Sequence, residues 1–348
     1  MFCDENSYSE KWCLVKQQFQ ELGGIAENVE LREGLNGRGL FPLDQACKVS
    51  LVCPYELLVS LDEIEIRRGE LIFIESSDKS TKIRDFVEFY YSSFVWNDHI
   101  RRQAIAFAHS IINLPEELKI VLNNYKLVDL RIFSLLNDEN EVLKRFLSQR
   151  QVIFKGKRFL APVWDLVNHS SFALPFRFTS NGLETPPKAP SNKEIVHKYS
   201  SMRSPSSMWN KYDFAGDGIV AYGFPLEARL IDDSFIFTCV GEQIFYGKAR
   251  QNVDHKDHQL FIKSLPVGCI SESLPSSYLF SILQPMGLNM ETSLLLMNQI
   301  QEFNLIERKK IIEYLVHNKL DTLSELSKAI TYEIDLIQNS VNRQGLIS

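Results

Sequence analysis

The sequence predicts an α+β fold, in which a strand-rich core carries a helical insert and is followed by an all-helical C-terminal lobe. Three observations support this prediction. Residues 29–59 are rich in strand-like segments, apolar residues recur every three to four positions from about 81 to 147, and the same spacing returns between 279 and 340. A chain of 348 residues with 45% hydrophobic residues can bury a sizeable core. This length allows two domains, or equally one large domain with a helical appendage.

The N-terminal part of the chain begins with a predicted helix over residues 8–22, which Gly23-Gly24 ends. One face of this helix carries apolar residues at helical spacing, namely Trp12, Val15, Phe19 and Leu22. An alternating strand follows at 29–32, and a glycine-rich stretch at 34–41 leads out of it. Closely spaced glycines favour either a hairpin with an Asn-Gly turn or a backbone that approaches a ligand.

The C-terminal half alternates between polar loops and helices. Residues 179–193 are rich in proline and polar residues, which predicts a surface loop. Ser204-Pro205-Ser206 is typical of a helix start, because proline is tolerated at the first helical position. Beyond residue 279 we expect further helices, at 294–303, 306–317 and 320–340.

The most unusual stretch lies at 160–171, where Asp165, Asn168 and His169 stand among core-forming residues. Burying such groups without hydrogen-bond partners costs several kcal/mol, on the order given for unpaired polar groups. The stretch is therefore either a satisfied polar cluster that holds a loop crossing, or part of a functional site.

This stretch resembles the Asp-x-x-Asn-His-Ser segment of SET-domain methyltransferases, in particular the branch that is similar to Rubisco large-subunit methyltransferase. Other segments of that family match in the same order. The run Asn-Gly-Arg-Gly-Leu at 36–40 looks like the first SET motif, and Arg150 is the nearest counterpart of the family's Ser-Arg-x-Phe arginine. Residues 194–214 are similar to the closing pattern, which holds two tyrosines, here Tyr199 and Tyr212.

The closing pattern also departs from the family. Ser200 replaces the glycine after the first tyrosine, Asp213 replaces the glycine of Tyr-Gly-Phe, and one extra residue separates the tyrosines. A literal Tyr-Gly-Phe follows at 222–224, but residues 215–221 predict no helix to carry it. Tyr212 is therefore favoured over Tyr222 as the second tyrosine.

The resemblance implies transfer of a methyl group from S-adenosylmethionine to a protein side chain, with lysine favoured over histidine as the acceptor. It assigns the catalytic role to Tyr212 and Tyr199, and makes Asp165 either a structural partner or a substrate contact. It places the cofactor against six residues, namely Arg38, Gly39, Leu40, Arg150, Asn168 and His169. It also implies a SET domain over 1–258, with its insert at about 81–147, and a helical substrate-binding-like domain over 259–348.

Two alternatives follow from the same residues. Pro162, Trp164 and Asp165 before the Asn-His pair are similar to the Pro-Leu-Trp-Asp run of actin-histidine methyltransferases, which favours a histidine acceptor. The departures at Ser200 and Asp213 favour a degenerate SET fold that binds a protein without chemistry, because side chains there narrow a space that glycine leaves open.

Composition restricts the remaining classes. A net charge of −6 argues against a protein whose main task is to grip nucleic acid. The expected partner, a protein substrate, is what the resemblance implies. The six cysteines form no Cys-x-x-Cys pair, which argues against zinc and for a reducing compartment. No apolar run reaches the 18 residues or so of a membrane span and the N-terminus is unlike a secretory signal, so we expect a cytoplasmic location, with nuclear entry and oligomeric state left open.

Overall fold

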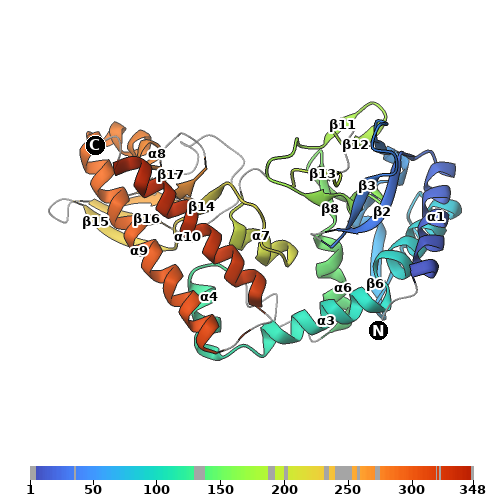
Figure 1. The fold of residues 1–348 in the computed structure, drawn as a ribbon, viewed down its shortest axis with the longest axis horizontal. Helices are drawn as coiled ribbons and strands as arrows, with labels where there is room; N and C mark the ends of the chain where they lie inside the picture. The colour runs from blue at the N-terminus through green and yellow to red at the C-terminus, as the bar shows by residue number, and fades with distance from the viewer. Residues whose placement is uncertain are drawn as a thin grey trace. The chain divides into compact units, whose positions relative to one another are not determined.

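The structure, a computed structural model, describes residues 5–34, 37–128, 138–186, 193–199, 203–230, 235–239, 253–256, 259–270, 275–318, 320 and 323–345. The chain forms two compact units (Figure 1). Unit 1 comprises residues 1–112 and 132–199, and unit 2 comprises 113–131 and 200–348. In the described part of the chain, no helix combines the length and the apolar character that crossing a membrane requires.

Unit 1 combines short strands with helices. Its helices are α1 (Glu5–Glu21), α2 (Thr81–Phe89), the π-helical segment η3 (Tyr90–Val95), α3 (Asp98–Ile112) and α6 (Glu139–Ser148), with 3-10 turns η1 (Tyr55–Leu57), η2 (Leu61–Glu63) and η4 (Trp164–Leu166). Its strands are β1 (Ile25–Glu27), β2 (Val29–Gly34), β3 (Gly37–Pro42), β4 (Ser50–Cys53), β5 (Val59–Ser60), β6 (Ile64–Arg67), β7 (Glu70–Phe73), β8 (Gln151–Phe154), β9 (Lys157–Leu160), β10 (Asn168–His169), β11 (Arg177–Thr179), β12 (Gly182–Glu184) and β13 (Val196–His197). They form small sheets with the orders β1-β4-β12-β11 and β5-β9-β8, two hairpins (β2-β3 and β6-β7) and the parallel pair β10-β13.

The predicted N-terminal helix is confirmed as α1, and its apolar face is buried. Trp12 is 6% exposed, and Val15 and Phe19 are fully buried. The helix ends where Gly23 takes a φ of +90°, a left-handed conformation that glycine adopts at little cost.

The glycine-rich stretch forms the hairpin β2-β3, with Leu31 opposite Leu40 and Gly34 opposite Gly37. The hairpin interpretation is therefore confirmed for the pairing of the strands. Residues 35 and 36, which include the Asn of the expected Asn-Gly turn, lie outside the described residues.

The expected surface loop over 179–193 is wrong at its beginning, because Gly182–Glu184 forms strand β12. Its Leu183 pairs with Cys53 of β4, so the segment lies inside a four-stranded sheet. Gly182 makes this possible, since a Cβ there would collide with the backbone of Cys53 and Pro54.

Unit 2 is dominated by helices, namely α4 (Glu116–Asn124), α7 (Pro205–Tyr212), α8 (Pro275–Leu283), α9 (Met290–His317) and α10 (Ser324–Gly345), with a 3-10 turn η6 (Gln284–Met286). Its described strands are β14 (Val220–Tyr222), β15 (Leu226–Leu230), β16 (Phe235–Cys239), β17 (Val253–Lys256), β18 (Gln259–Ile262) and β19 (Pro266–Cys269). They pair as β14-β19 and as the sheet β15-β16-β18-β17. An apolar core joins strand residues such as Ile262 and Val267 to Leu279, Met297 and Ile337 of the helices.

The α+β class and the C-terminal helices are as predicted, but the helices run differently. The segments expected at 294–303 and 306–317 form the single 28-residue helix α9. One boundary between the compact units falls between 199 and 200, and residues of β14, β18 and β19 share a core with the C-terminal helices. The division into a SET domain and a C-terminal substrate-binding-like domain is a functional one, and it stays a prediction.

Candidate functional site

The side-chain amide of Asn168 joins three segments of unit 1 that are far apart in the sequence. Its Nδ2 donates to the carbonyl of Arg38 in β3, at 2.9 Å, and to Oε1 of Glu194, at 2.5 Å. The backbone N–H of Ile195 donates to the carbonyl of Leu40, at 2.7 Å. The β3 strand, the Asn-His pair and the segment before β13 therefore form one polar cluster.

Gly39 lies directly beneath this cluster. A Cβ at this position would collide with the Glu194 carboxylate and would come within 2.7 Å of the Asn168 amide nitrogen. Only glycine lets the two side chains pack this closely on the strand. A larger residue at position 39 would require the Glu194 carboxylate and the Asn168 amide to shift.

His169 is 7% exposed, and both of its ring nitrogens are used within the chain. Its Nδ1 accepts from the backbone N–H of Tyr199, at 3.0 Å, so Nε2 carries the proton and donates to Oγ of Ser171, also at 3.0 Å. The Tyr199 hydroxyl donates to the carbonyl of Val167, at 2.7 Å. The imidazole thus holds the backbone of Tyr199, and the phenol is tied back to the same segment.

Asp165 lies in a buried polar group, with its side chain only 1% exposed. Tyr90, from the π-helical segment η3, donates its hydroxyl to Oδ1, and Nε of Arg150 lies 3.6 Å from Oδ2. Burial raises the pKa of Asp165 to about 6, against the opposing effects of Arg150 and Tyr90. Burial also lowers the pKa of Arg38 to about 10, and the charge of Arg150 adds to this effect.

The backbone before Asp165 is strained. Val163 is fully buried and has a φ of +67°, which is rare for a β-branched residue. Such a conformation costs on the order of 1–3 kcal/mol and is retained only when the surroundings enforce it. It begins the turn η4, which carries Trp164 into the core against His197, with ring centroids 4.3 Å apart.

Tyr212 belongs to unit 2, whereas Tyr199 is the last residue of unit 1, so each is placed only within its own unit. Tyr212 ends α7, half-buried, and the guanidinium carbon of Arg203 lies 5.9 Å from the centre of its ring. Tyr222 lies in the strand β14 and is 6% exposed. The sequence is therefore right that no helix carries Tyr222, while the catalytic role of Tyr212 and Tyr199 stays a prediction.

Of the residues assigned by the resemblance, those in unit 1 lie close to one another, and two contributors were not assigned. Glu194 is the first residue of the segment 194–214 that is similar to the closing pattern, so the alignment contained a signal for it. Tyr90 stands 75 residues before Asp165 in the chain, and nothing in the local sequence indicates this contact. In the described part of the chain, no group of three or more His, Cys, Asp or Glu side chains is arranged to hold a metal ion.

Comparison with known proteins gives a mixed result. No protein-family profile and no curated protein matches the sequence. Among solved structures, the chain is similar to the SET domain of LSMT bound to lysine and AdoHcy, with a TM-score of 0.44, 13% identity and coverage of 97% of this chain and 90% of that one. It is also similar to Rubisco LSMT bound to sinefungin and monomethyllysine, with a TM-score of 0.44, 14% identity and coverage of 98% and 92%. TM-scores below 0.5 at this identity establish neither the family nor the activity of this chain.

Proposed function

We propose that this chain is an S-adenosylmethionine-dependent protein methyltransferase of the SET type that acts on lysine. The observation that carries the proposal is the bonding of the Asn168 amide to the Arg38 carbonyl and to Glu194. The segments at Arg38 and Asn168 are 130 residues apart, and the segment at Glu194 lies a further 26 residues along the chain, yet all three meet at this amide. If the short motifs resembled the family only by chance, there would be no reason for these segments to contact one another in the fold.

The residues of this cluster suit the charges of the cofactor. S-adenosylmethionine carries a carboxylate, an ammonium and a sulfonium. Arg38 and Arg150 lie near the carboxylate of Asp165, and a guanidinium is a donor that suits the cofactor carboxylate. The carbonyl of Arg38 and the carboxylate of Glu194 are acceptors that suit the two cationic groups.

Methyl transfer requires little covalent help from the protein. The bound cofactor supplies a methyl group that is activated for in-line displacement. The chain has to align the acceptor amine and exclude water, and desolvation lowers the pKa of a lysine and so supplies its neutral form. In this proposal Tyr212 orients the amine, and Tyr199, whose backbone is held by His169, is the second catalytic tyrosine.

The acceptor is proposed to be lysine because the similarity to actin-histidine methyltransferases has a structural explanation here. Trp164 is 3% exposed and packs against His197, and Asp165 is bonded to Tyr90. We therefore assign Asp165 as a structural partner. Mass spectrometry of proteins labelled by the purified enzyme is expected to find methyl-lysine, and methyl-histidine as the only product would overturn this choice.

A second candidate, a protein-binding module without chemistry, is favoured by one observation. The side chains of Glu194 and Asn168 occupy the space directly above Gly39, where the resemblance expects backbone to meet the cofactor. A module of this kind would not bind S-adenosylmethionine. Calorimetry with the purified chain separates the two functions, since micromolar binding supports the enzyme and an absence of binding supports the module.

Asn168→Ala is the sharpest test of the proposed cofactor site. Loss of the polar contacts is expected to weaken S-adenosylmethionine binding about tenfold to a hundredfold, because a lost hydrogen bond costs roughly 1–3 kcal/mol. The control is Asn181→Ala, which makes the same change at an exposed loop position of the same unit. Unchanged affinity in folded Asn168→Ala protein would contradict the assignment.

A further inference from the structure

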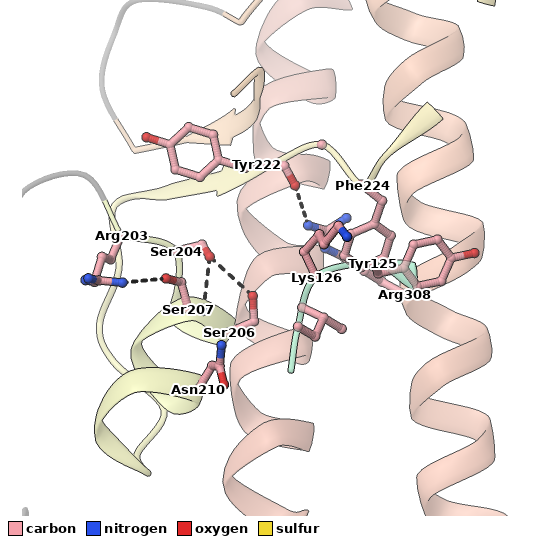
Figure 2. Close-up of a pocket in the computed structure, with 12 residues that line it drawn as sticks. Tyr125, Lys126, Arg203, Ser204, Ser206, Ser207, Asn210, Tyr222, Phe224 and Arg308 are labelled. Carbon is pink, nitrogen blue, oxygen red and sulfur yellow. Dashed lines mark hydrogen bonds between the residues drawn. The ribbon is translucent and has the colours of Figure 1, made fainter. Parts of the chain in front are cut away.

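Unit 2 contains a cavity of about 180 Å³ beside α7, between the segment that follows α4 and the end of β14 (Figure 2). Its described lining includes the side chains of Lys126, Arg203 and Arg308 and the hydroxyls of three serines, but no Asp or Glu. At this volume it is smaller than the pockets that hold cofactors, and suits a single side chain. The cavity therefore has a positive lining in a chain whose net charge is −6.

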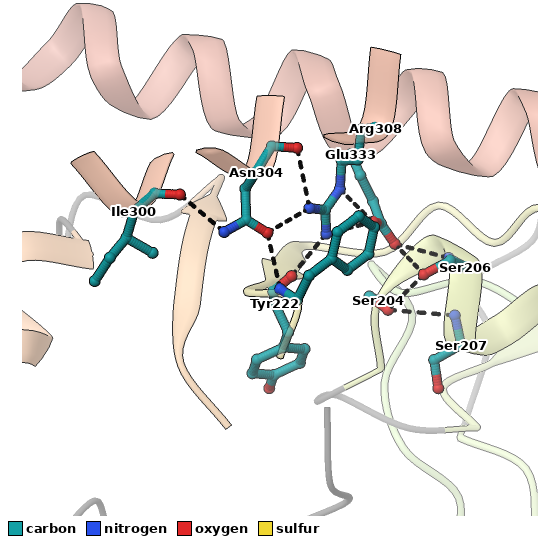
Figure 3. A network of polar contacts seen from close by, with 9 residues as sticks. Ser204, Ser206, Ser207, Tyr222, Ile300, Asn304, Arg308 and Glu333 are labelled. Carbon is teal, nitrogen blue, oxygen red and sulfur yellow. Dashed lines mark hydrogen bonds and ion pairs between the residues drawn. The ribbon is translucent and has the colours of Figure 1, made fainter. Parts of the chain in front are cut away.

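One wall of the cavity is held by a buried polar network (Figure 3). Arg308 is 1% exposed, and it donates to Oε2 of Glu333 at 2.8–2.9 Å, to Oδ1 of Asn304 at 2.7 Å and to the carbonyl of Tyr222 at 2.6 Å. Because Glu333 neutralises it, Arg308 shapes the wall but adds no net charge. The rings of Phe224 and Tyr125 stack at 4.3 Å along the same side.

Arg203 supplies the charge. Its Nη1 donates to Oγ of Ser207, at 3.1 Å, and its guanidinium carbon lies 5.9 Å from the ring centre of Tyr212. No carboxylate of the described residues forms an ion pair with it, although a guanidinium offers five N–H donors. Lys126, the second cation of the lining, is exposed.

We propose that this cavity binds a carboxylate side chain of the protein substrate, close to the residue that is methylated. The proposal rests on the proposed function, since it takes Tyr212 as the residue that orients the acceptor. Arg203 lies 5.9 Å from the ring centre of Tyr212, and an extended chain advances about 3.5 Å per residue, so a carboxylate held on Arg203 belongs to a residue near the acceptor in the sequence. The preferred substrate therefore carries an Asp or Glu next to the methylated side chain.

The test uses two capped peptides, Gly-Ala-Glu-Lys-Ala-Gly and the same peptide with Gln in place of Glu. Their binding to the full-length chain is measured by calorimetry at low salt, without cofactor. The Glu peptide is expected to bind about threefold to tenfold more tightly, because one charge-assisted contact is gained at a partly exposed site. The preference should decline as salt rises, since the Debye length shortens.

Two variants locate the preference. Arg203→Gln is expected to abolish it and Lys126→Gln to reduce it, whereas Lys309→Gln, which removes an exposed cation of α9, should leave it unchanged. No preference in the wild-type chain, or the same preference in folded Arg203→Gln protein, would overturn the proposal. The proposal would also be overturned if inorganic phosphate displaced both peptides equally and the chain bound the two peptides with the same affinity. That result would indicate a general anion site.

Methyl transfer to the same peptides separates this inference from the proposed function. Equal transfer to both peptides, with no difference in binding, contradicts the carboxylate site while the methyltransferase stands. A binding preference that Arg203→Gln removes, in a chain that transfers no methyl group to any peptide, supports the carboxylate site and counts against the proposed activity.

Discussion

At the scale of single residues, the backbone conformation of Asp213 accounts for the replacement of the glycine in the closing pattern. It follows α7 with a φ of +66°, in the left-handed region that glycine favours. Asp is among the few other residues that adopt this conformation at modest cost. The backbone after Tyr212 therefore follows the path that a glycine would allow, so the substitution at 213 does not by itself argue against activity. Ser200, the other departure, lies outside the described residues.

Tyr212→Phe is expected to reduce methyl transfer by about 10²-fold or more while S-adenosylmethionine binding is unchanged. The phenol hydroxyl donates and accepts on a rigid ring, and misalignment of a reacting pair carries a cost of this size. Phenylalanine keeps the ring that faces Arg203 and Phe214, so the fold is preserved. Single-turnover rates and calorimetry measure the two effects separately.

Tyr222→Phe is the matched control for this change. Tyr222 is buried in β14 and contributes its carbonyl to Arg308, so removal of its hydroxyl should leave the rate within a few-fold of the wild type. A loss of activity in Tyr222→Phe but not in Tyr212→Phe would show that the closing motif is misaligned by ten residues.

At the scale of elements, helix α7 is held at both ends by carboxylates of α10. Near its start, Oε1 of Glu333 accepts from the backbone N–H of Ser206, at 2.9 Å, and from the serine hydroxyl. Beyond its end, Glu325 accepts from the N–H of Ala215, at 3.1 Å. A negative charge near a helix N-terminus is favourable because the N–H groups there lack helical partners. The helix that carries Tyr212 is thus positioned by α10.

Glu333→Gln is expected to lower the free energy of unfolding by about 3–5 kcal/mol, because it leaves the buried Arg308 without a counter-charge. The double variant Arg308→Met with Glu333→Leu removes both charges and is expected to recover most of this loss. Urea denaturation of the three proteins measures the difference. A double variant as unstable as the single one would show that the charge pair is not the origin of the effect.

An exposed ion pair provides the control. Lys310 lies 2.7 Å from Glu307 one turn away on α9, with 63% of its own side chain exposed. Lys310→Gln is expected to change the unfolding free energy by less than about 1 kcal/mol, since exposed pairs are screened by water.

At the scale of the whole molecule, two buried groups of unit 1 set opposing pH dependences. Burial raises the pKa of Asp165 in the folded state to about 6. The folded state therefore loses stability as pH rises from about 4 to 6, because the carboxyl must then ionise while buried. Burial lowers the pKa of His197 to about 3, so the folded state gains stability as pH rises from about 3 to 6.5. Between pH 4 and 6 the two effects nearly cancel.

Replacing either residue should reveal the pH dependence that the other residue gives to the stability. When the pH falls from 6 to 4, the unfolding free energy of Asp165→Asn is expected to fall by about 2 kcal/mol relative to the wild type. Over the same range, that of His197→Phe is expected to rise by about 2 kcal/mol relative to the wild type. Urea titrations at several pH values measure these slopes. Parallel curves for the wild type and both variants would contradict the opposing dependences.

The sequence predicted those parts of the molecule whose signals are local. The face of α1 follows from apolar spacing, the end of that helix follows from Gly23, and the start of α7 follows from Ser204 and Pro205. In the candidate site, the resemblance of short motifs predicted Arg38, Asn168 and the residues near them, and their role stays a prediction. Such features depend on side chains within one or two turns of each other, so a linear pattern contains them.

The tertiary structure alone decided the contacts between distant segments. A proline-rich stretch contains β12 because β4 supplies its hydrogen bonds, and α9 continues through a gap in apolar spacing because its polar Asn304 and Arg308 are bonded within the core. The meeting of Asp165 with Tyr90 likewise has no local pattern. Hydrogen bonds and burial of this kind depend on which segments the fold brings together, and that depends on the packing of the whole unit rather than on neighbouring residues.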